Sequence, residues 1–496
     1  MKYTDRQFTA PISKAMEAYA GDGALAFHTP GHKQGLGAHP LLKNLLTEAG
    51  LRQEVSLMEE LDDLHEPSGC IKEAQELAAE LWGARESLFI INGTTGAIQA
   101  MIAGTLSPGD SVLVPRNAHR SIMGGIILAG AVPIYIQPEI DNRLGIAMGL
   151  STEAVRQAVA AHPKAKALIA VYPTYYGFCC DLGQIAEIVH GAGMLLLVDE
   201  AHGAHLRFGK ELPLQAIDLG ADVAAQSTHK LLGSMTQSSM LHIGSSRVDD
   251  ERIRQAASLL QSTSPNQLLL ASLDIARLQM AQEGQRRVNR AVELSQWLRQ
   301  RINEISGLYC PGSEIFGKGA VALDWTKITV NLAGLDISGQ EAELLLRHQW
   351  KVQCELSDPQ NLLFIISMAD TRAEADRLLQ VLGELAALHQ GGVKNAKDTL
   401  NMAKMPVPVR RMNPRQAFFA KARTVKLEQA IGCIGAETIA FYPPGIPVLC
   451  PGEEISEALV SYIRYYQGQG MRISGAADST LQTIRVCQSE CSDRKI

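Results

Sequence analysis

Apolar segments of strand length alternate with helical patterns between about residues 70 and 245, and this alternation restricts the folds open to the chain. Residues 71–81 carry apolar side chains at helical spacing, and residues 185–190 form a second such pattern that stops at Gly191. Strands are predicted over residues 87–91, 111–115, 132–137, 167–172, 194–198, 222–225 and 238–243. Strands separated by helices are joined by right-handed crossovers, so the pattern predicts an α/β fold with a seven-stranded, mostly parallel sheet covered on both faces.

Two polar motifs follow neighbouring segments of this predicted sheet. Asp199-Glu200-Ala201-His202 comes directly after residues 194–198, and Ser227-Thr228-His229-Lys230 comes just after residues 222–225. Ligand sites of such sheets gather at the carboxyl ends of the strands. A lysine can form a Schiff base with the aldehyde of pyridoxal phosphate (PLP), and an aspartate can keep the pyridine nitrogen protonated. Although most lysines are surface charges, the pairing of Lys230 with Asp199 predicts a PLP site.

A third segment has the character of a phosphate-binding loop. Asn92-Gly93-Thr94-Thr95-Gly96-Ala97 follows a predicted strand and opens a helix, so its free N–H groups and the hydroxyls of Thr94 and Thr95 could bind the phosphate. Ordinary helix caps use the same residue types. Ser227 and His229 are further candidate donors beside Lys230.

Two histidines are candidates for contact with the cofactor or substrate. His119 lies one βα step after the phosphate loop, where its imidazole could stack on the pyridine ring or simply cap a helix. His202 lies three residues after Asp199, where a turn would bring it to the ring or to the substrate carboxylate as a proton donor.

Composition excludes several other classes of protein. The net charge of −6 makes nucleic acid and anionic membranes poor partners, and no run of 18 apolar residues or secretory leader is seen. Nine cysteines, an odd number without paired CxxC spacing, indicate reduced thiols in a cytoplasmic protein without a metal site.

At 496 residues the chain is expected to form two to four domains. A long helical region after Ser264-Pro265 leads into a smaller α+β layer, and a polar segment rich in Gly and Pro precedes the last unit. The predicted parts are an N-terminal segment over 1–68, a PLP-binding large domain over 69–284, a small α+β domain over 285–389, a linker over 390–409 and a C-terminal domain over 410–496.

Together, these motifs resemble the Orn/Lys/Arg decarboxylase family of fold type I (aspartate aminotransferase-like) PLP enzymes. The resemblance covers nearly the whole chain. Besides the motifs ending in His202 and Lys230, it rests on Phe27-His28-Thr29-Pro30-Gly31-His32-Lys33, Asp62-Asp63-Leu64-His65-Glu66-Pro67-Ser68-Gly69, Tyr442-Pro443-Pro444-Gly445-Ile446-Pro447 and Pro451-Gly452-Glu453. The first of these lies within 35 residues of the start, so the chain resembles the short form that lacks an N-terminal wing domain.

The resemblance implies roles for individual residues. Lys230 would carry the Schiff base, Asp199 would pair with the pyridine nitrogen and His119 would stack on the ring. The other residues implied to bind the cofactor are Thr94, Thr95, Ala201, Ser227 and His229, with Thr263 or Ser264 from a neighbouring subunit. A homodimer with shared active sites, or a higher oligomer built from it, follows from this arrangement. His202, His229 and Lys230 remain alternatives for the group that protonates the substrate Cα.

The substrate is expected to be a basic amino acid. The short form resembles bacterial biosynthetic arginine decarboxylases, so arginine to agmatine in polyamine biosynthesis is preferred over lysine to cadaverine and ornithine to putrescine. Asp62, Asp63, Glu66 and Glu437 are candidates to bind the distal charge. A PLP aminotransferase and a catalytically silent PLP-binding protein are the alternatives from other classes.

Overall fold

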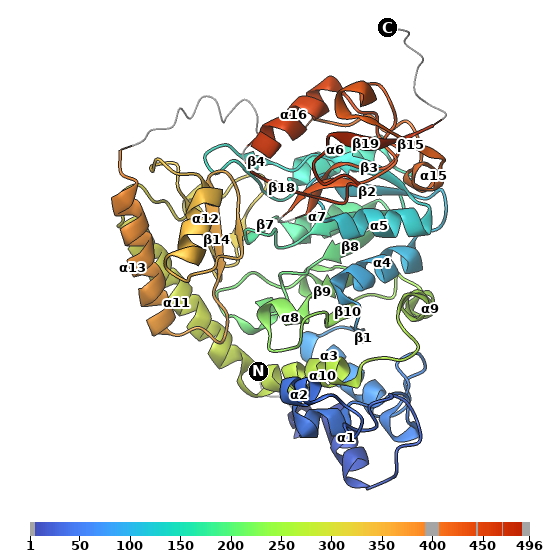
Figure 1. Ribbon diagram of the computed structural model, residues 1–496. Helices are drawn as coiled ribbons and strands as arrows, with labels where there is room; N and C mark the ends of the chain where they lie inside the picture. The colour runs from blue at the N-terminus through green and yellow to red at the C-terminus, as the bar shows by residue number, and fades with distance from the viewer. Residues whose placement is uncertain (1–4, 392–405, 443–444, 469, 489–496) are drawn as a thin grey trace. The chain divides into compact units, whose positions relative to one another are not determined.

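The structure is a computed structural model that describes residues 5–391, 406–442, 445–468 and 470–488 (Figure 1). Its chain divides into two compact units. Unit 1 comprises residues 1–105, 195–210 and 214–289, and unit 2 comprises residues 106–194, 211–213 and 290–496. The predicted linker over 390–409 falls largely on residues 392–405, which lie outside the described residues.

All seven strands predicted for the main sheet are present. They are β1 (Glu86–Ile90), β2 (Ser111–Pro115), β3 (Val132–Ile136), β6 (Ala167–Val171), β8 (Leu195–Asp199), β9 (Val223–Gln226) and β10 (Ser239–Ile243). The strand order is β1-β10-β9-β8-β6-β2-β3. β8 pairs in parallel with β9, and β2 in parallel with β3 and β6, whereas β10 is antiparallel to both of its neighbours. The sheet is therefore mixed and mostly parallel, as predicted.

Helices of unit 1 pack beside its four strands of the sheet. The helices are α1 (Pro11–Gly21), α2 (Pro40–Gln53), α3 (Cys70–Trp82), α4 (Gly93–Thr105), α8 (Thr228–Leu231), α9 (Asp250–Leu260) and α10 (Gln267–Gln279), which continues through a π-helical turn at Met280–Gly284. α4 lies against α9, where Gly104 approaches Ile253 so closely that an added Cβ would lie 2.7 Å from the Ile253 Cα. This close packing holds the helix that begins at the predicted phosphate loop.

A buried ion pair fastens the N-terminal segment to α10. Arg277 and Asp274 are fully buried, and the Arg277 Nη2 lies 2.8 Å from the Asp274 Oδ1. Arg277 also donates to the backbone carbonyls of Gln7 and Thr9, while Asp274 accepts the Ile12 N–H at 3.1 Å. Because a buried charge requires partners, the residues that supply these carbonyls are tied to the core of unit 1.

Unit 2 contains the rest of the main sheet with α5 (Arg120–Ala129), α6 (Thr152–Ala161) and α7 (Leu182–Gly191). A small antiparallel sheet of β12 (Lys327–Asn331), β14 (Asn361–Ile365) and β13 (Leu356–Ser357) packs with α12 (Gly339–His348) and α13 (Arg372–Leu388), and α11 (Gln285–Asn303) leads into it. Residues 320–324 fall within the predicted small α+β domain, but they do not join its sheet. Ala322–Leu323 form β11, which pairs with β7 (Phe178–Cys179). Leu323 packs with Phe178 in a separate hydrophobic core.

The C-terminal part of unit 2 has its own hydrophobic core. Its elements are α15 (Pro414–Phe419), β15 (Ala422–Lys426), β16 (Ile439–Tyr442), β17 (Ile446–Leu449), α16 (Glu457–Gly468), β18 (Arg472–Ser474) and β19 (Thr483–Cys487). The short strands β4 (Ile140–Asp141) and β5 (Ile146–Ala147) form one further antiparallel pair in unit 2. The domain boundaries proposed from the sequence stay a prediction, because the compact units cut across them.

Cysteine chemistry partly follows the expectation of reduced thiols. Among the described residues, the cysteines at positions 70, 179, 180, 310, 354, 450 and 487 are thiols. Cys433 is disulfide-bonded, so the expectation fails at that residue. No helix among the described residues is long and apolar enough to cross a membrane.

Candidate active site

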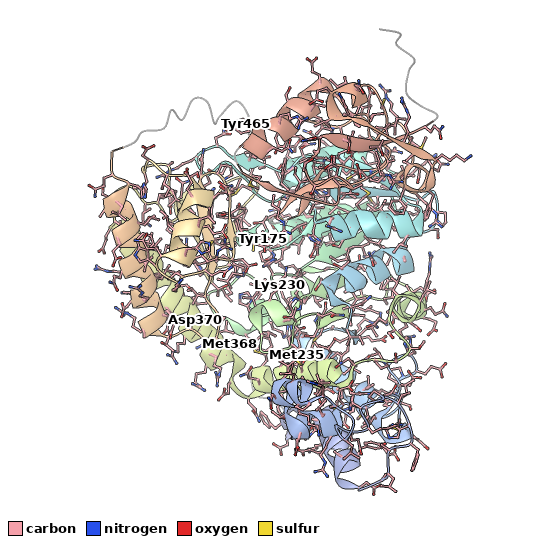
Figure 2. The ribbon with its side chains drawn as sticks, in the orientation of Figure 1. Tyr175, Lys230, Met235, Met368, Asp370 and Tyr465 are labelled. Carbon is pink, nitrogen blue, oxygen red and sulfur yellow. The ribbon has the colours of Figure 1, made fainter. Side chains whose placement is uncertain are left out.

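The two motifs predicted to form the site come together in unit 1. β8 and β9 are parallel neighbours in which Asp199 is paired with Ala225, so the residues that follow both strands leave the same edge of the sheet. Residues 228–231 form the single helical turn α8, which presents Lys230 (Figure 2). The Lys230 Nζ lies 2.8 Å from the His202 Nε2.

Asp199 is a buried carboxylate in the electrostatic field of this lysine. Its side chain accepts the Ala201 N–H at 3.2 Å, and the residue is 4% exposed. Burial raises the pKa of Asp199, and this effect outweighs the lowering by the Lys230 charge and the Ala201 N–H. A buried carboxylate that lacks a full counter-charge is suited to bind a cationic N–H group.

Three hydroxyl groups meet beside the start of α4. The Thr94 Oγ1 lies 2.5 Å from the Ser227 Oγ and 2.9 Å from the Ser239 Oγ, and all three residues are buried. Thr95, also predicted to contact the phosphate, is exposed at the same helix start. Ser239 was missed in the sequence, because a single serine at the start of an apolar strand gives no signal.

The start of α4 has the features of an anion-binding cradle. Asn92 folds over it so closely that a Cβ at Gly96 would lie 2.0 Å from the Asn92 Oδ1. The Thr228 Oγ1 is one of several buried polar atoms without a hydrogen-bond partner among the residues that the structure describes, and its hydroxyl can donate. The first N–H groups of a helix also lack intrahelical partners and favour negative charge. These residues therefore fit the phosphate of PLP.

His229 is held with its ring facing the backbone. Its Nδ1–H donates to the Ser238 carbonyl at 2.7 Å. Burial lowers the pKa of His229 and outweighs the raising effect of the Ser238 bond, and the nearby Lys230 charge lowers the pKa further. The ring is therefore neutral with its proton on Nδ1, and that N–H is already engaged by the backbone.

His119 belongs to unit 2, at the start of α5. Its Nδ1 accepts the Ser121 N–H at 3.2 Å and lies 2.8 Å from the Ser121 Oγ. The helix-capping role that the sequence left open is therefore present. Capping uses Nδ1 only, so the ring face stays compatible with the stacking role.

Thr263 and Ser264 are exposed in the segment between α9 and α10. Within the described part of the chain, neither side chain bonds to Thr94 or Ser227. The segment is nevertheless anchored, because Gln261 accepts the Ile91 N–H at 2.9 Å and His65 contacts the Ser262 carbonyl at 2.9 Å. An anchored but exposed pair of hydroxyls suits a contact with another subunit.

Two of the carboxylates considered for the substrate's distal charge have structural partners. Asp62 accepts the N–H groups of Ser68, Gly69 and Ile71 at the start of α3, and Glu437 accepts those of Ala477 and Arg485. Asp63 accepts the His65 N–H, and Glu66 is exposed. The geometry thus makes Asp62 and Glu437 weaker candidates than the sequence suggested.

A buried polar network, which no local sequence pattern indicates, crosses the other side of the four unit 1 strands. The Glu200 Oε1 and Oε2 accept the Ala216 N–H at 2.7 Å and the Gln226 Nε2 at 2.8 Å. Gln226 continues to the His242 Nε2 at 3.1 Å, and the His242 Nδ1 lies 2.7 Å from the Ser87 Oγ. Burial raises the pKa of Glu200 to about 8 and lowers that of His242 to about 3. The network therefore holds the ends of adjacent strands together on the side of the sheet opposite Asp199.

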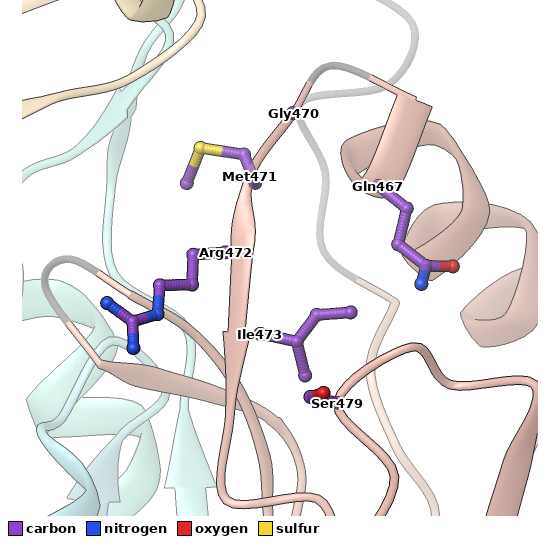
Figure 3. A pocket seen from close by; sticks show the side chains of 6 residues that line it. All are labelled: Gln467, Gly470, Met471, Arg472, Ile473 and Ser479. Atoms are coloured by element: carbon purple, nitrogen blue, oxygen red, sulfur yellow. The ribbon is translucent and has the colours of Figure 1, made fainter.

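A separate cavity of about 500 Å³ opens beside β18 in the C-terminal part of unit 2 (Figure 3). It is lined by Gln467, Gly470, Met471, Arg472, Ile473 and Ser479. None of the residues predicted for the cofactor site lines it, so we assign it no part in the reaction.

Comparison with known proteins places the chain in a family. The model described as Orn/Lys/Arg decarboxylase, major domain, matches residues 10–374, and the C-terminal domain model matches residues 397–482. The chain belongs to the Orn/Lys/Arg decarboxylase family. The family is PLP-dependent, which agrees with the cofactor predicted from Lys230 and Asp199.

Individual relatives support this assignment. The chain is 43% identical to an arginine decarboxylase of Halalkalibacterium halodurans, over 97% of this chain and 98% of the relative. It is 42% identical to an arginine decarboxylase of Bacillus subtilis, over 98% and 99% of the two chains. Among solved structures, a lysine decarboxylase of Francisella novicida has the same fold, with a TM-score of 0.84 and 22% identity over 97% of this chain and 82% of that one.

The buried Glu200 predicts a pH-dependent stability. Its folded pKa of about 8 exceeds the unfolded value of about 4.3, so between these values the folded protein binds more protons and its stability falls as pH rises. Glu200→Gln should reduce the fall in the free energy of unfolding with rising pH by up to about 1.4 kcal/mol per pH unit. Urea unfolding between about pH 5 and pH 8 measures the slope.

The exposed Glu17→Gln is the matched control and should leave the slope as in the wild type. Equal slopes for the wild type and Glu200→Gln would show that Glu200 is ionised throughout this range.

Proposed function

We propose that this chain decarboxylates L-arginine to agmatine and CO₂, with PLP bound at Lys230. The observation that carries the proposal is the buried Asp199 carboxylate in the field of Lys230, at the ends of two parallel strands. Four curated relatives at 41–43% identity are named arginine decarboxylases, which favours arginine over the other basic amino acids. Lysine is the runner-up, because a lysine decarboxylase of Pseudomonas aeruginosa is 26% identical.

PLP supplies an electron sink for the electron pair released when the bond between Cα and the carboxylate breaks. Asp199 would hold the pyridine N–H, because its buried carboxylate gains most from a cationic partner. Thr94, Thr95, Ser227 and the first N–H groups of α4 would hold the phosphate, with Ala201 beside the ring. His119 would stack on the ring, and the neutral His229 would orient α8 through the Ser238 carbonyl.

Lys230 and His202 form the proton-transfer pair of the site. With 2.8 Å between the Lys230 Nζ and the His202 Nε2, an ammonium group on Lys230 can donate to a neutral imidazole. The transfer leaves a neutral amine, which is the nucleophilic form of lysine. After CO₂ leaves, the same pair can return a proton to Cα, so we favour Lys230 and His202 over His229 for this step.

Desolvation would assist the reaction. His202 is 5% exposed, so a substrate carboxylate beside it would exchange water for a poorly hydrated environment. Because CO₂ leaves as a neutral molecule, the charge would pass from the carboxylate to the Cα side, where the cofactor would delocalise it, and stabilisation that grows toward the transition state accelerates the step.

A homodimer belongs to the proposal. Unit 1 exposes large apolar side chains near its N-terminus that monomers seldom leave in water, with exposed fractions of 82% at Leu25, 91% at Phe27 and 86% at Leu36. The exposed Thr263 and Ser264 would reach the phosphate of the partner's cofactor. A cytoplasmic place in polyamine biosynthesis agrees with the thiols of seven of the described cysteines.

The substrate can be tested with the PLP-loaded protein and arginine, lysine or ornithine supplied separately. Release of CO₂ and the matching amine should be fastest by kcat/KM with arginine. Preference for lysine would overturn the assignment of the substrate, and formation of a keto acid without CO₂ would favour an aminotransferase.

The role of Lys230 is tested by Lys230→Ala. This variant should lose the visible absorbance of covalently held cofactor and at least about 10³-fold in kcat, because no other amine can form the bond to the aldehyde. Lys210→Ala, which removes an exposed lysine of the same unit, is the control. A Lys230→Ala spectrum like that of the wild type would disprove the assignment.

The dimer is tested by Phe27→Asp combined with Leu36→Asp. Charges on an apolar interface are costly to bury, so sedimentation velocity should show a shift from dimer to monomer. Leu214→Asp alters an exposed leucine elsewhere in unit 1 and should leave the dimer intact. A wild-type protein that sediments as a monomer would refute this part of the proposal.

A further inference from the structure

The turn that carries His119 is held by the C-terminal part of the chain. Arg116 follows β2, and its guanidinium makes two bonds with Glu453, Nη1 to Oε1 at 2.9 Å and Nη2 to Oε2 at 3.1 Å. Both side chains are 1% exposed. A bidentate pair fixes the plane as well as the position of the guanidinium.

The groups around this ion pair leave it little freedom. The Arg116 Nη2 also donates to the Val448 carbonyl at 3.0 Å, and the Glu453 Oε2 accepts the Cys450 N–H at 2.7 Å. The ring of Tyr135 on β3 lies 4.6 Å from the guanidinium. Arg116 is thus enclosed between the sheet and the segment 448–453.

α5, the helix that begins just after His119, is held at both ends by the same part of the chain. At its start, the Arg120 N–H donates to the Gly445 carbonyl at 3.2 Å. At its end, Arg415 donates to the Leu128 carbonyl at 2.6 Å, and the Asn413 Nδ2 donates to the Ala131 carbonyl at 3.3 Å. Figure 1 shows α15 beside α5.

These contacts decide the position of His119. The residue lies between Arg116 and Arg120, each of which is bonded to the C-terminal part, and its own Nδ1 is bonded to Ser121. With the backbone fixed on both sides and the ring fixed at Nδ1, the plane of the imidazole follows the position of this turn. A small displacement of a supporting group can cost far more in function than in stability.

We propose that Glu453 is a positioning residue, which fixes the turn at Arg116 and thereby sets the plane of the His119 ring. The inference deepens the proposed function and depends on it through the stacking role of His119.

The test compares Glu453→Gln with Glu454→Gln in the PLP-loaded protein. Glu453→Gln removes the charge of the buried pair, and the rate of PLP release should rise at least about tenfold, as for other supporting residues. Glu454→Gln breaks a neighbouring exposed ion pair, in which the Glu454 Oε2 lies 2.7 Å from Arg411, and should release PLP at the wild-type rate. PLP release is followed by the loss of visible absorbance after dilution.

A double-mutant cycle with His119→Ala separates positioning from general destabilisation. If Glu453 acts through His119, adding Glu453→Gln to His119→Ala should not accelerate PLP release further. Effects that multiply in the double variant, or wild-type release by folded Glu453→Gln, would overturn the inference.

If Glu453→Gln fails to fold, Arg116→Met combined with Glu453→Leu replaces the buried pair by apolar groups, which often restores stability. The folded double variant should still release PLP faster than the wild type. Release at the wild-type rate would overturn the inference. The proposed function has its own test, because it is wrong if the wild-type protein forms no CO₂ from arginine. Even in that case, the comparison of PLP release rates still decides whether Glu453 is a positioning residue.

Discussion

The register between β8 and β9 is the constraint on which the candidate site depends. It pairs Asp199 with Ala225, so that the motif after each strand emerges at the same edge and Lys230 falls in the field of the buried aspartate. The next residue, Glu200, turns to the opposite side and joins the buried network with Gln226 and His242. Because successive side chains of a strand alternate, a slip by one residue would exchange the two acids.

Two groups of buried polar side chains have different tasks in this site. Asp199 and His202 interact with Lys230 and are chemically suited to exchange protons or to hold a cation. Glu200 and His242 belong to the separate buried network, have pKa values shifted toward their neutral forms and serve as hydrogen-bonding scaffold. Perturbed pKa values alone therefore would not have separated the reactive groups from the supporting ones.

Much of the large-domain sheet and several site residues could be predicted from the sequence because they rest on local patterns. Apolar runs located all seven strands to within about two residues, and polar motifs after strands located Lys230, Asp199 and Thr94. Ser239, Glu200 and the pairing of Arg116 with Glu453 were missed, because each depends on contacts between residues distant in the sequence. β11 was assigned to the wrong layer for the same reason, since a two-residue strand carries no sign of its partner.

The pairing of Arg116 with Glu453 also bears on the order in which the protein becomes functional during synthesis. The two residues are 337 positions apart, so the ribosome completes β2 and α5 long before the acid that neutralises Arg116 exists. Until then the guanidinium must stay hydrated, because an unpaired charge is costly to bury. The turn at His119 can therefore settle only after the segment that contains Glu453 has been synthesised.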